Sequence, residues 1–418
     1  MSDTLSAHDT DVLRRLAHRK AEIALAPANL ERRDLWYRHD AGTGGRPMVL
    51  AEIGGLRDRL LPIPDTALEC TDPWARGLER RLRIEVYQFE VLRDDHVVEP
   101  FVETNWQVEV SGYGVQPTFH HTDNDGHLAA RRWDPALKDL DRDLGHLQPR
   151  TYCVDRQATQ AEKERLERVL GGILPVRLRG GFWWTLGMTW TAIELIGLDQ
   201  LMLSMYDNPA GLHRLMAFLR DESLRYAAWL EDEGLLALNN ENDYIGSGSM
   251  GYTRALPADG RRRGDAVRTQ DLWVLLESQE TVGVGPDQFA EFVFPYQEAI
   301  ARRFGRAYYG CCEPVHTRLH VLRRLPNLAR ISVSPWADQE QMARQLGAEV
   351  VFSRKPNPTL VSTRVFDEEA IRADLRRTLD VTRGCRVELI MKDVHTLDDE
   401  PARLPRWVEL ARRAIDET

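Results

Sequence analysis

Apolar residues in the second part of the chain form short unbroken runs separated by longer amphipathic stretches, starting near Leu170. A strand buried on both faces has an apolar run of this kind, so the alternation predicts parallel strands covered by helices. Val98–Trp106, in the N-terminal half, is a further strand candidate that would close a barrel. The runs themselves predict strands at Pro175–Arg179, Leu235–Asn239, Leu272–Glu277, Arg306–Cys312, Ala329–Val333, Glu349–Phe352 and Arg386–Met391.

Helix signals lie between these runs. Asn208-Pro209 opens an amphipathic stretch that should end at Gly234, Gly285-Pro286 opens another, and Asp367 precedes two acids on the first turn of a third. The pattern therefore predicts an α/β fold, a (β/α)₈ TIM barrel with an outer ring of helices.

The N-terminal part has a different pattern. A charged helix is expected at about Asp11–His39, and Asp123-Asn124-Asp125-Gly126 lies between alternating polar runs within His120–Trp133, as in a hairpin turn. We expect residues 1–95 to form a helical extension, residues 96–418 to form the barrel, and His120–Gln148 to be a hairpin and loop excursion on it.

Composition narrows the classes of function. The chain has 418 residues, 55 basic against 65 acidic side chains and a net charge of −10, with the arginines scattered among acids, so a nucleic-acid partner is not expected. No apolar run reaches the ~20 residues that cross a bilayer, and the first residues lack the pattern of a secretory signal. A cytoplasmic location, without a membrane partner, is expected. The five cysteines are then free thiols or ligands.

The strand that begins at Arg306 ends in Cys311, Cys312 and Glu313, and Pro314 starts the next helix. In a barrel the carboxyl ends of the strands carry the chemistry. Thiolate, carboxylate and imidazole together suit an open catalytic zinc site. The alternative is that the two cysteines are small buried residues that fill the top of the barrel.

The last predicted strand ends in Lys392, Asp393 and His395. A cation, a carboxylate and an imidazole at one rim suit acid–base chemistry or metal binding. The alternative is a solvated loop with a Lys–Asp pair. Cys385 begins this strand and should lie at the opposite end of the barrel, so it is not a ligand candidate.

Other polar residues follow predicted strands. Glu277 and Glu280 come after one strand, and Asn240, Glu241 and Asp243 come after another, before a glycine-rich loop at residues 246–251. Paired carboxylates at a barrel rim can serve as acid and base, although one of them can instead pair with an arginine such as Arg179.

Aromatic residues and one lysine recur at similar positions. Aromatic side chains at strand ends suit the wall of a substrate site, although each can equally pack under a loop. The predicted substrate-binding residues are Trp183, Trp184, Asn240, Asp243, Tyr309, Trp336 and Lys355.

From about Pro175 to the C-terminus the chain resembles the uroporphyrinogen decarboxylase superfamily, which includes corrinoid-linked methyltransferases. The resemblance lies in Glu291–Tyr296, in the strand that ends at Cys311-Cys312-Glu313, and in the last strand and loop that reach His395. In the methyltransferase branch a His-x-Cys pair and a second cysteine bind zinc. Gly310 or Tyr309 replaces that histidine here, and Lys392 to His395 occupy the loop of the second cysteine. A zinc site would therefore be built from Cys311, Cys312, Glu313 and His395.

The resemblance implies a methyltransferase that moves a methyl group between a small methylated compound and a corrinoid or another one-carbon carrier. Zinc and a corrinoid protein are then the expected cofactor and partner, and a homodimer is left open. The catalytic candidates are His395, Glu241, Glu277, Glu280, Lys392 and Asp393.

Two alternatives remain open. The decarboxylase branch grips carboxylates with an N-terminal arginine-rich segment, for which Trp36-Tyr37-Arg38 is a poor substitute, and His395 matches its last-loop histidine by position. A metal-free decarboxylase would use Lys355, Lys392 and His395. The other alternative is a binding protein on the same barrel without chemistry.

Overall fold

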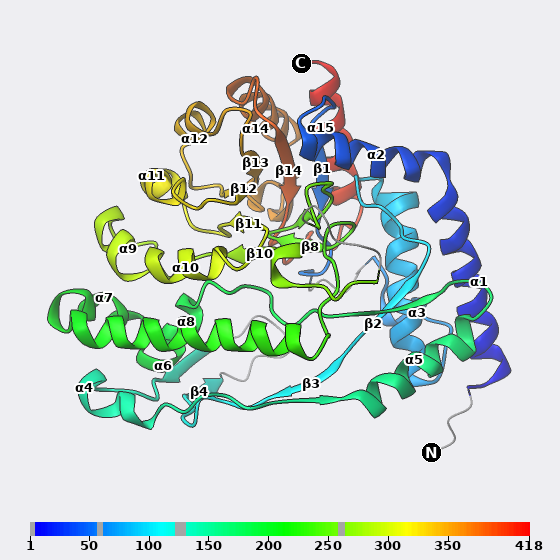
Figure 1. Cartoon of the computed structure of the whole chain (residues 1–418). Helices are drawn as coiled ribbons and strands as arrows, with labels where there is room; N and C mark the ends of the chain where they lie inside the picture. Colours follow the sequence, from blue (N-terminus) through cyan, green and yellow to red (C-terminus); the bar gives the residue numbers. More distant parts are fainter. Residues whose placement is uncertain (1–4, 57–61, 122–130, 258–263) are drawn as a thin grey trace.

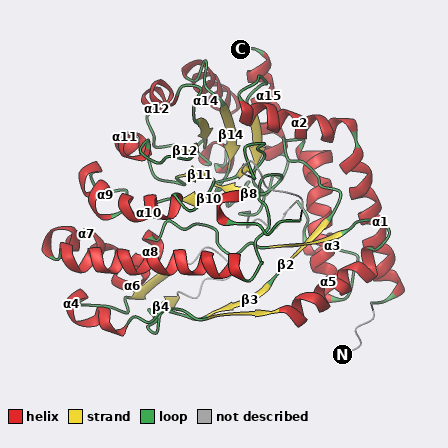
Figure 2. Cartoon of the chain, viewed as in Figure 1, coloured by secondary structure: helices red, strands yellow, loops and turns green. Residues whose placement is uncertain are grey.

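The computed structural model describes residues 5–56, 62–121, 131–257 and 264–418. Helices follow one another around the outside of a central parallel sheet (Figure 1), and the helical, strand and loop segments are distinguished in Figure 2. The strands are β1 Met48–Ala51, β2 Val102–Asn105, β3 Gln107–Val110, β4 Thr118–His121, β5 Arg131–Asp134, β6 Tyr152–Asp155, β7 Val176–Arg179, β8 Tyr244–Gly246, β9 Ser249–Met250, β10 Trp273–Leu276, β11 Arg306–Tyr309, β12 Leu328–Val333, β13 Val351–Arg354 and β14 Val387–Met391.

The helices cover both the sheet and the N-terminal part of the chain. Their bounds are α1 Ala7–Leu25, α2 Pro27–Ala41, α3 Pro73–Tyr87, α4 Leu140–Asp143, α5 Arg156–Leu170, α6 Thr189–Ile196, α7 Leu198–Asp207, α8 Pro209–Asp232, α9 Pro286–Phe292, α10 Phe294–Ala301, α11 Leu319–Leu322, α12 Gln339–Leu346, α13 Thr359–Ser362, α14 Glu368–Val381 and α15 Arg403–Asp416. Among the described residues, no helix combines the length and the apolar character needed to cross a bilayer.

The central sheet has six strands in the order β1-β14-β13-β12-β11-β10, and every pair in it is parallel. β2 and β7 form a separate parallel pair. The strands described here therefore give an α/β fold with a parallel sheet, as predicted, but they do not form a closed ring of hydrogen-bonded strands. Val98–Trp106 contains β2, which pairs with β7 and does not complete the larger sheet.

Two differences from the predicted strands have local causes. β1 lies within the segment expected to be only helical, and its four buried residues pair in register with Glu388–Met391 of β14. Leu235–Asn239 is not a strand. There the Asn239 side chain, and not the backbone, makes hydrogen bonds to β10. Its Oδ1 accepts from Trp273 N at 2.9 Å, and its Nδ2 donates to Trp273 O at 3.1 Å.

The N-terminal helices form their own small core. Apolar residues of α1, α3 and α5 pack together, among them Leu13, Leu82 and Leu166. The predicted helix at Asp11–His39 is two helices, because Ala26 is extended before Pro27, which cannot donate a backbone hydrogen bond. The predicted hairpin is present as antiparallel β4 and β5, and its Asp-Asn-Asp-Gly turn lies outside the described residues.

Helices α8, α9, α10 and α14 occupy the positions that the sequence predicts. Asn208 caps α8 by accepting from Gly211 N at 2.8 Å, and Asp367 caps α14 through Glu369 N and Ala370 N. The predicted helix after Gly285 is divided at Val293, where α9 ends and α10 begins.

Because the six strands of the sheet are parallel, their carboxyl ends meet at one edge. This edge carries Glu52, Glu277, Cys311, Lys355 and Lys392, each within two residues of the end of its strand. The short hairpin of β8 and β9 lies beside these strands: Gly246 approaches Tyr308, and Gly248 approaches both Ile390 and Glu52. A Cβ at Gly248 would be 2.6 Å from Ile390 Cγ2, and its φ of 87° favours glycine, so the close approach needs a glycine.

Candidate functional site

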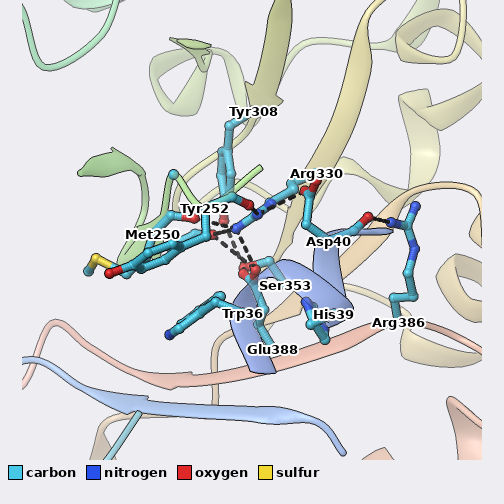
Figure 3. A network of polar contacts seen from close by, with 12 residues as sticks. Trp36, His39, Asp40, Met250, Tyr252, Tyr308, Arg330, Ser353, Arg386 and Glu388 are labelled. Atoms are coloured by element: carbon cyan, nitrogen blue, oxygen red, sulfur yellow. Dashed lines mark hydrogen bonds and ion pairs between the residues drawn. The ribbon is translucent and has the colours of Figure 1, made fainter. Parts of the chain in front are cut away.

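A buried polar network links the hairpin to the interior of the sheet (Figure 3). The Arg330 guanidinium donates to Glu388 Oε1 at 2.8 Å, to Ser249 Oγ at 2.8 Å and to Asp40 Oδ1 at 3.0 Å. Arg330 and Glu388 are both fully buried. Although burial works against the charge, Arg330 holds the pKa of Glu388 below its usual range. This is a paired, hydrogen-bonded core and not an open site.

Lys355 belongs to this network. Its ammonium donates to Tyr308 Oη at 2.8 Å and to Ser353 Oγ at 2.7 Å, and Ser353 Oγ donates to Glu388 Oε2 at 2.7 Å. Burial lowers the pKa of Lys355 to about 7. The structure therefore places this predicted substrate-binding lysine in the interior.

Cys311 and Cys312 end the β11 strand as an adjacent thiol pair. Their Sγ atoms are 3.5 Å apart, with Cys311 buried and Cys312 exposed. Because the Cys311 thiol donates to Cys312, and because Cys311 is buried, the pKa of Cys311 is raised. The same hydrogen bond lowers the pKa of Cys312. Cys312 is therefore the more reactive thiol of the pair.

The end of β14 lies beside these thiols, as the sequence predicts. Lys392 Nζ is 3.9 Å from Cys311 Sγ and 3.4 Å from Asp393 Oδ1, and Asp393 Oδ2 is 3.7 Å from Cys312 Sγ. Lys392 is also 3.4 Å from Ser247 Oγ in the β8–β9 hairpin. The strand ends thus bring Cys311, Cys312, Lys392 and Asp393 together.

Glu313 and His395 have other partners. The Glu313 carboxylate is buried and accepts from two backbone amides, Ser278 N at 2.9 Å and Cys311 N at 2.9 Å. His395 is exposed, and its Nδ1 lies 3.3 Å from Gly55 O. In the described part of the chain, no three His, Cys, Asp or Glu side chains are grouped to hold a metal. The four predicted ligands do not fit a zinc site, because Glu313 already holds the loop together through both oxygens.

Glu277 and Glu280 come after β10 in the chain, and Glu277 follows its last residue directly. The Glu277 side chain is buried, and burial, followed by the charges of Glu280 and Glu313, raises its pKa well above the usual range. Glu280 accepts from Thr189 Oγ1 at 2.6 Å, and burial raises its pKa too. Tyr309, predicted to bind substrate, is also buried, and its hydroxyl donates to Gln297 Oε1 at 2.9 Å.

An open cavity lies at the carboxyl ends of β2 and β7, next to β10. Its volume is about 230 Å³. This is smaller than a typical pocket for a drug-sized ligand and suits a small molecule. Its polar and aromatic lining comprises Glu103, Asn105, Arg179, Phe182, Trp183, Trp184, Asn239, Asp243, Tyr244 and Trp273.

The charged residues of this cavity are already paired with one another. Arg179 donates to Glu103 Oε1 at 2.5 Å and to Leu238 O at 2.5 Å, and it lies 3.3 Å from Asp243 Oδ1. Burial raises the pKa of Asp243 to about 6, although Arg179 opposes that rise. Arg179 therefore has few donors left for the carboxylate of a ligand.

The β8–β9 hairpin connects the cavity with the thiol pair. Its Tyr244 lines the cavity, and its Ser247 Oγ lies 3.4 Å from Lys392 Nζ. Lys392 Nζ in turn lies 3.9 Å from Cys311 Sγ. Burial raises the pKa of Tyr244 to about 12, and Glu52 adds to this rise while Lys392 opposes it.

The sequence predictions and the cavity agree only in part. Trp183, Trp184 and Asp243 line it, whereas Asn240 and Glu241 do not: Asn240 Nδ2 donates to Leu256 O at 2.7 Å, and Glu241 lies 3.8 Å from Arg177. Trp336 is 68% exposed and does not line this cavity.

Several lining residues were not predicted as binding residues. Arg179 ends β7 and Glu103 lies within β2, and both are short mixed strands that lack a strong apolar signal. Tyr244 directly follows the predicted Asp243, and this adjacency was the available signal. Glu52, which lies at the edge of the central sheet and does not line the cavity, was missed because it follows a run of only four apolar residues, Met48–Ala51, in the segment expected to be helical.

No protein-family model matches the sequence, and no curated protein matches it. Among solved structures, the fold is similar to that of a methyltransferase from Methanosarcina mazei, with a TM-score of 0.50 and 13% sequence identity. The similarity covers 92% of this chain and 98% of that one. At this identity the likeness shows that the two chains share a fold, and it extends over nearly the whole of both.

Proposed function

We propose that this protein is a methyltransferase that takes a methyl group from a small compound in the cavity and passes it to a separate carrier. The carrier would be a reduced corrinoid or another nucleophilic one-carbon acceptor. The observation that carries the proposal is a small aromatic-walled cavity lined by Tyr244 of the β8–β9 hairpin, whose Ser247 contacts Lys392 beside the Cys311–Cys312 pair. The shared fold with a methyltransferase supports it.

The charge pattern of the cavity favours this function over decarboxylation. A decarboxylase must bind at least one substrate carboxylate, but Arg179, the only cation among the lining residues, is already held by Glu103 and Asp243. The carboxylate of a substrate would compete with Glu103 and Asp243 for the few donors of Arg179. A neutral or cationic methylated compound meets no such conflict.

In the proposed reaction the aromatic walls hold the donor so that its methyl group faces the rim. The bond between the donor heteroatom and the methyl carbon breaks, and its electron pair stays on the donor. The carrier supplies the pair for the new bond. Cys312 acts beside this path: its polarizable sulfur offers negative charge to the methyl carbon, which is partly positive in the transition state. No step is assigned to a zinc ion.

The test is methyl transfer to reduced cobalamin from a panel of small methylated amines, quaternary ammonium compounds, ethers and thioethers. The absorption spectrum of the corrinoid and the mass of the demethylated product report the reaction. Cys312→Ala should slow transfer at least about tenfold, which corresponds to about 1.4 kcal/mol of transition-state stabilisation.

Cys385→Ser is the matched control, because Cys385 lies before β14, at the opposite end from the thiol pair, and its Sγ is near Ala343 O at 3.7 Å. Its transfer rate should equal that of the unmodified protein. If no panel compound loses a methyl group to cobalamin or to an added thiol, the proposed function is wrong.

A further inference from the structure

Trp273 differs from the other four aromatic rings that line the cavity in having cations stacked on it. Arginine side chains stack on many rings, and two of them cover the Trp273 ring: Arg306 at 4.7 Å and Arg330 at 5.0 Å from its centroid. Within the described residues, no lysine or arginine stacks on Phe182, Trp183, Trp184 or Tyr244. On these four rings a ligand cation would therefore compete with no stacked lysine or arginine of the described residues, and two of the rings, Trp184 and Tyr244, are exposed.

The two most accessible of these rings form the entrance. Trp184 and Tyr244 are each 46% exposed, and both line the cavity. Large aromatic side chains left this exposed beside a cavity are typical of a binding site.

The charges of the lining have the sign that a cation needs. Two carboxylates, Glu103 and Asp243, and one guanidinium, Arg179, leave a surplus of one negative charge when both acids are ionised. Trp183 adds a further ring beside them, packed edge-on against Phe304 with its centroid 5.8 Å away. Rings and carboxylates together attract a poorly hydrated cation more strongly than either does alone.

We infer that the cavity binds a small methylated onium cation, a quaternary ammonium compound, with its methyl groups against Trp184 and Tyr244. This inference rests on the proposed function for the fate of the methyl group, but binding itself does not depend on transfer. A quaternary nitrogen cannot donate hydrogen bonds, so ring faces and a net negative charge are the features that recognise it. The volume of about 230 Å³ limits the ligand to a small molecule.

The test compares choline with its neutral isostere, in which a carbon atom replaces the nitrogen. Tryptophan fluorescence and calorimetry measure binding to the full chain. Choline should bind about tenfold more tightly, because the two ligands have the same shape and only choline gains cation–π and charge interactions in the cavity.

Variants locate the binding site. Trp184→Leu should abolish the preference for choline, and Trp184→Phe should keep part of it. Trp190→Leu is the matched control, since Trp190 is 40% exposed on α6 and does not line the cavity. It should bind choline as the unmodified protein does. A circular dichroism spectrum and melting temperature like those of the unmodified protein establish that each variant is folded.

The outcomes separate this inference from the proposed function. Equal affinity for choline and the neutral isostere, or a preference that survives in Trp184→Leu, would overturn the cation site even if methyl transfer from another compound is found. A strong choline preference without methyl transfer to any carrier would support the cation site and would count against the methyltransferase.

Discussion

Charged residues are buried on one side of this fold and accessible on the other. On the side of β11 to β14, Arg330, Glu388, Asp40 and Lys355 are buried and bonded to one another. On the side of β2 and β7, Arg179, Glu103 and Asp243 line an open cavity with exposed aromatic rings beside them. Charged residues at strand ends can therefore be part of the core, and accessibility decides which of them meet a ligand.

The largest expected effect separates a core network from a surface pair. Arg330→Met leaves Glu388 buried without its arginine and leaves Asp40 with Arg306 alone, so the free energy of unfolding should fall by about 3–5 kcal/mol. Arg323→Met removes an exposed ion pair with Glu349 and should change the free energy of unfolding by less than about 1 kcal/mol. Urea unfolding of both variants measures the contrast. A similar small change in both would show that the two sides do not differ in this way.

The next effect is a pH dependence of stability that arises from Lys355. Its pKa is about 7 in the folded protein and near the ordinary lysine value of 10.5 in the unfolded chain. Between these values only the unfolded chain holds the proton, so stability should rise with pH from about 7, by at most about 1.4 kcal/mol per pH unit. This gain in stability should be lost as the pH falls towards 7.

Lys355→Met should remove that part of the slope. The measurement is the free energy of unfolding at a series of pH values for both proteins, and only the difference between the two slopes is attributed to Lys355. Identical slopes would mean that the lysine is exposed to water and that the network around Ser353 and Tyr308 is not as tightly packed as described.

On the cavity side, Asp243 should make cation binding depend on pH. Its pKa is about 6, so the carboxyl loses its charge as pH falls from 8 to 5, and the affinity for choline should fall by up to about tenfold. Arg179, Glu103 and Glu241 are the charged groups near it. Asp243→Asn should bind choline more weakly at pH 8 and show little change between the two pH values. A variant that keeps the full pH dependence would assign it to another group.

The smallest effect is expected at the rim. His395→Ala removes an exposed ring that has one hydrogen-bond contact, with Gly55 O, within the described residues, so the free energy of unfolding should change by less than about 0.5 kcal/mol. His39→Ala is the buried counterpart, because His39 is buried and forms a hydrogen bond with Val387 O at 2.9 Å. This substitution should lower the free energy of unfolding by about 1–3 kcal/mol. If the stability of His395→Ala is unchanged, any loss of turnover in that variant reports on chemistry alone.

Apolar runs were a good guide to the parallel strands and a poor guide to the site. Three of the predicted runs contain β10, β11 and β14, and two more overlap β12 and β13, because strands buried on both faces need unbroken apolar sequence. β1 was missed because four apolar residues next to a long helix give a weak signal. Leu235–Asn239 has the composition of a strand, but the Asn239 side chain bonds to Trp273 where a backbone ladder would be expected.

The candidate site shows the same limit. The sequence placed Cys311, Cys312, Lys392 and Asp393 near one another because parallel strands share one edge, and the structure brings them together. It did not indicate that Glu313 would use both oxygens on backbone amides, or that Arg179 would be held by Glu103 and Asp243. Such pairings depend on contacts between segments far apart in the chain, which strand patterns do not specify.

The most direct test of the cavity as the substrate site is a crystal of the protein soaked with tetramethylarsonium, an onium cation whose arsenic scatters anomalously. We predict an arsenic peak inside the cavity, next to the rings of Trp184 and Tyr244, and loss of that peak in crystals of Trp184→Leu. An empty cavity in crystals that bind the cation elsewhere would contradict the account.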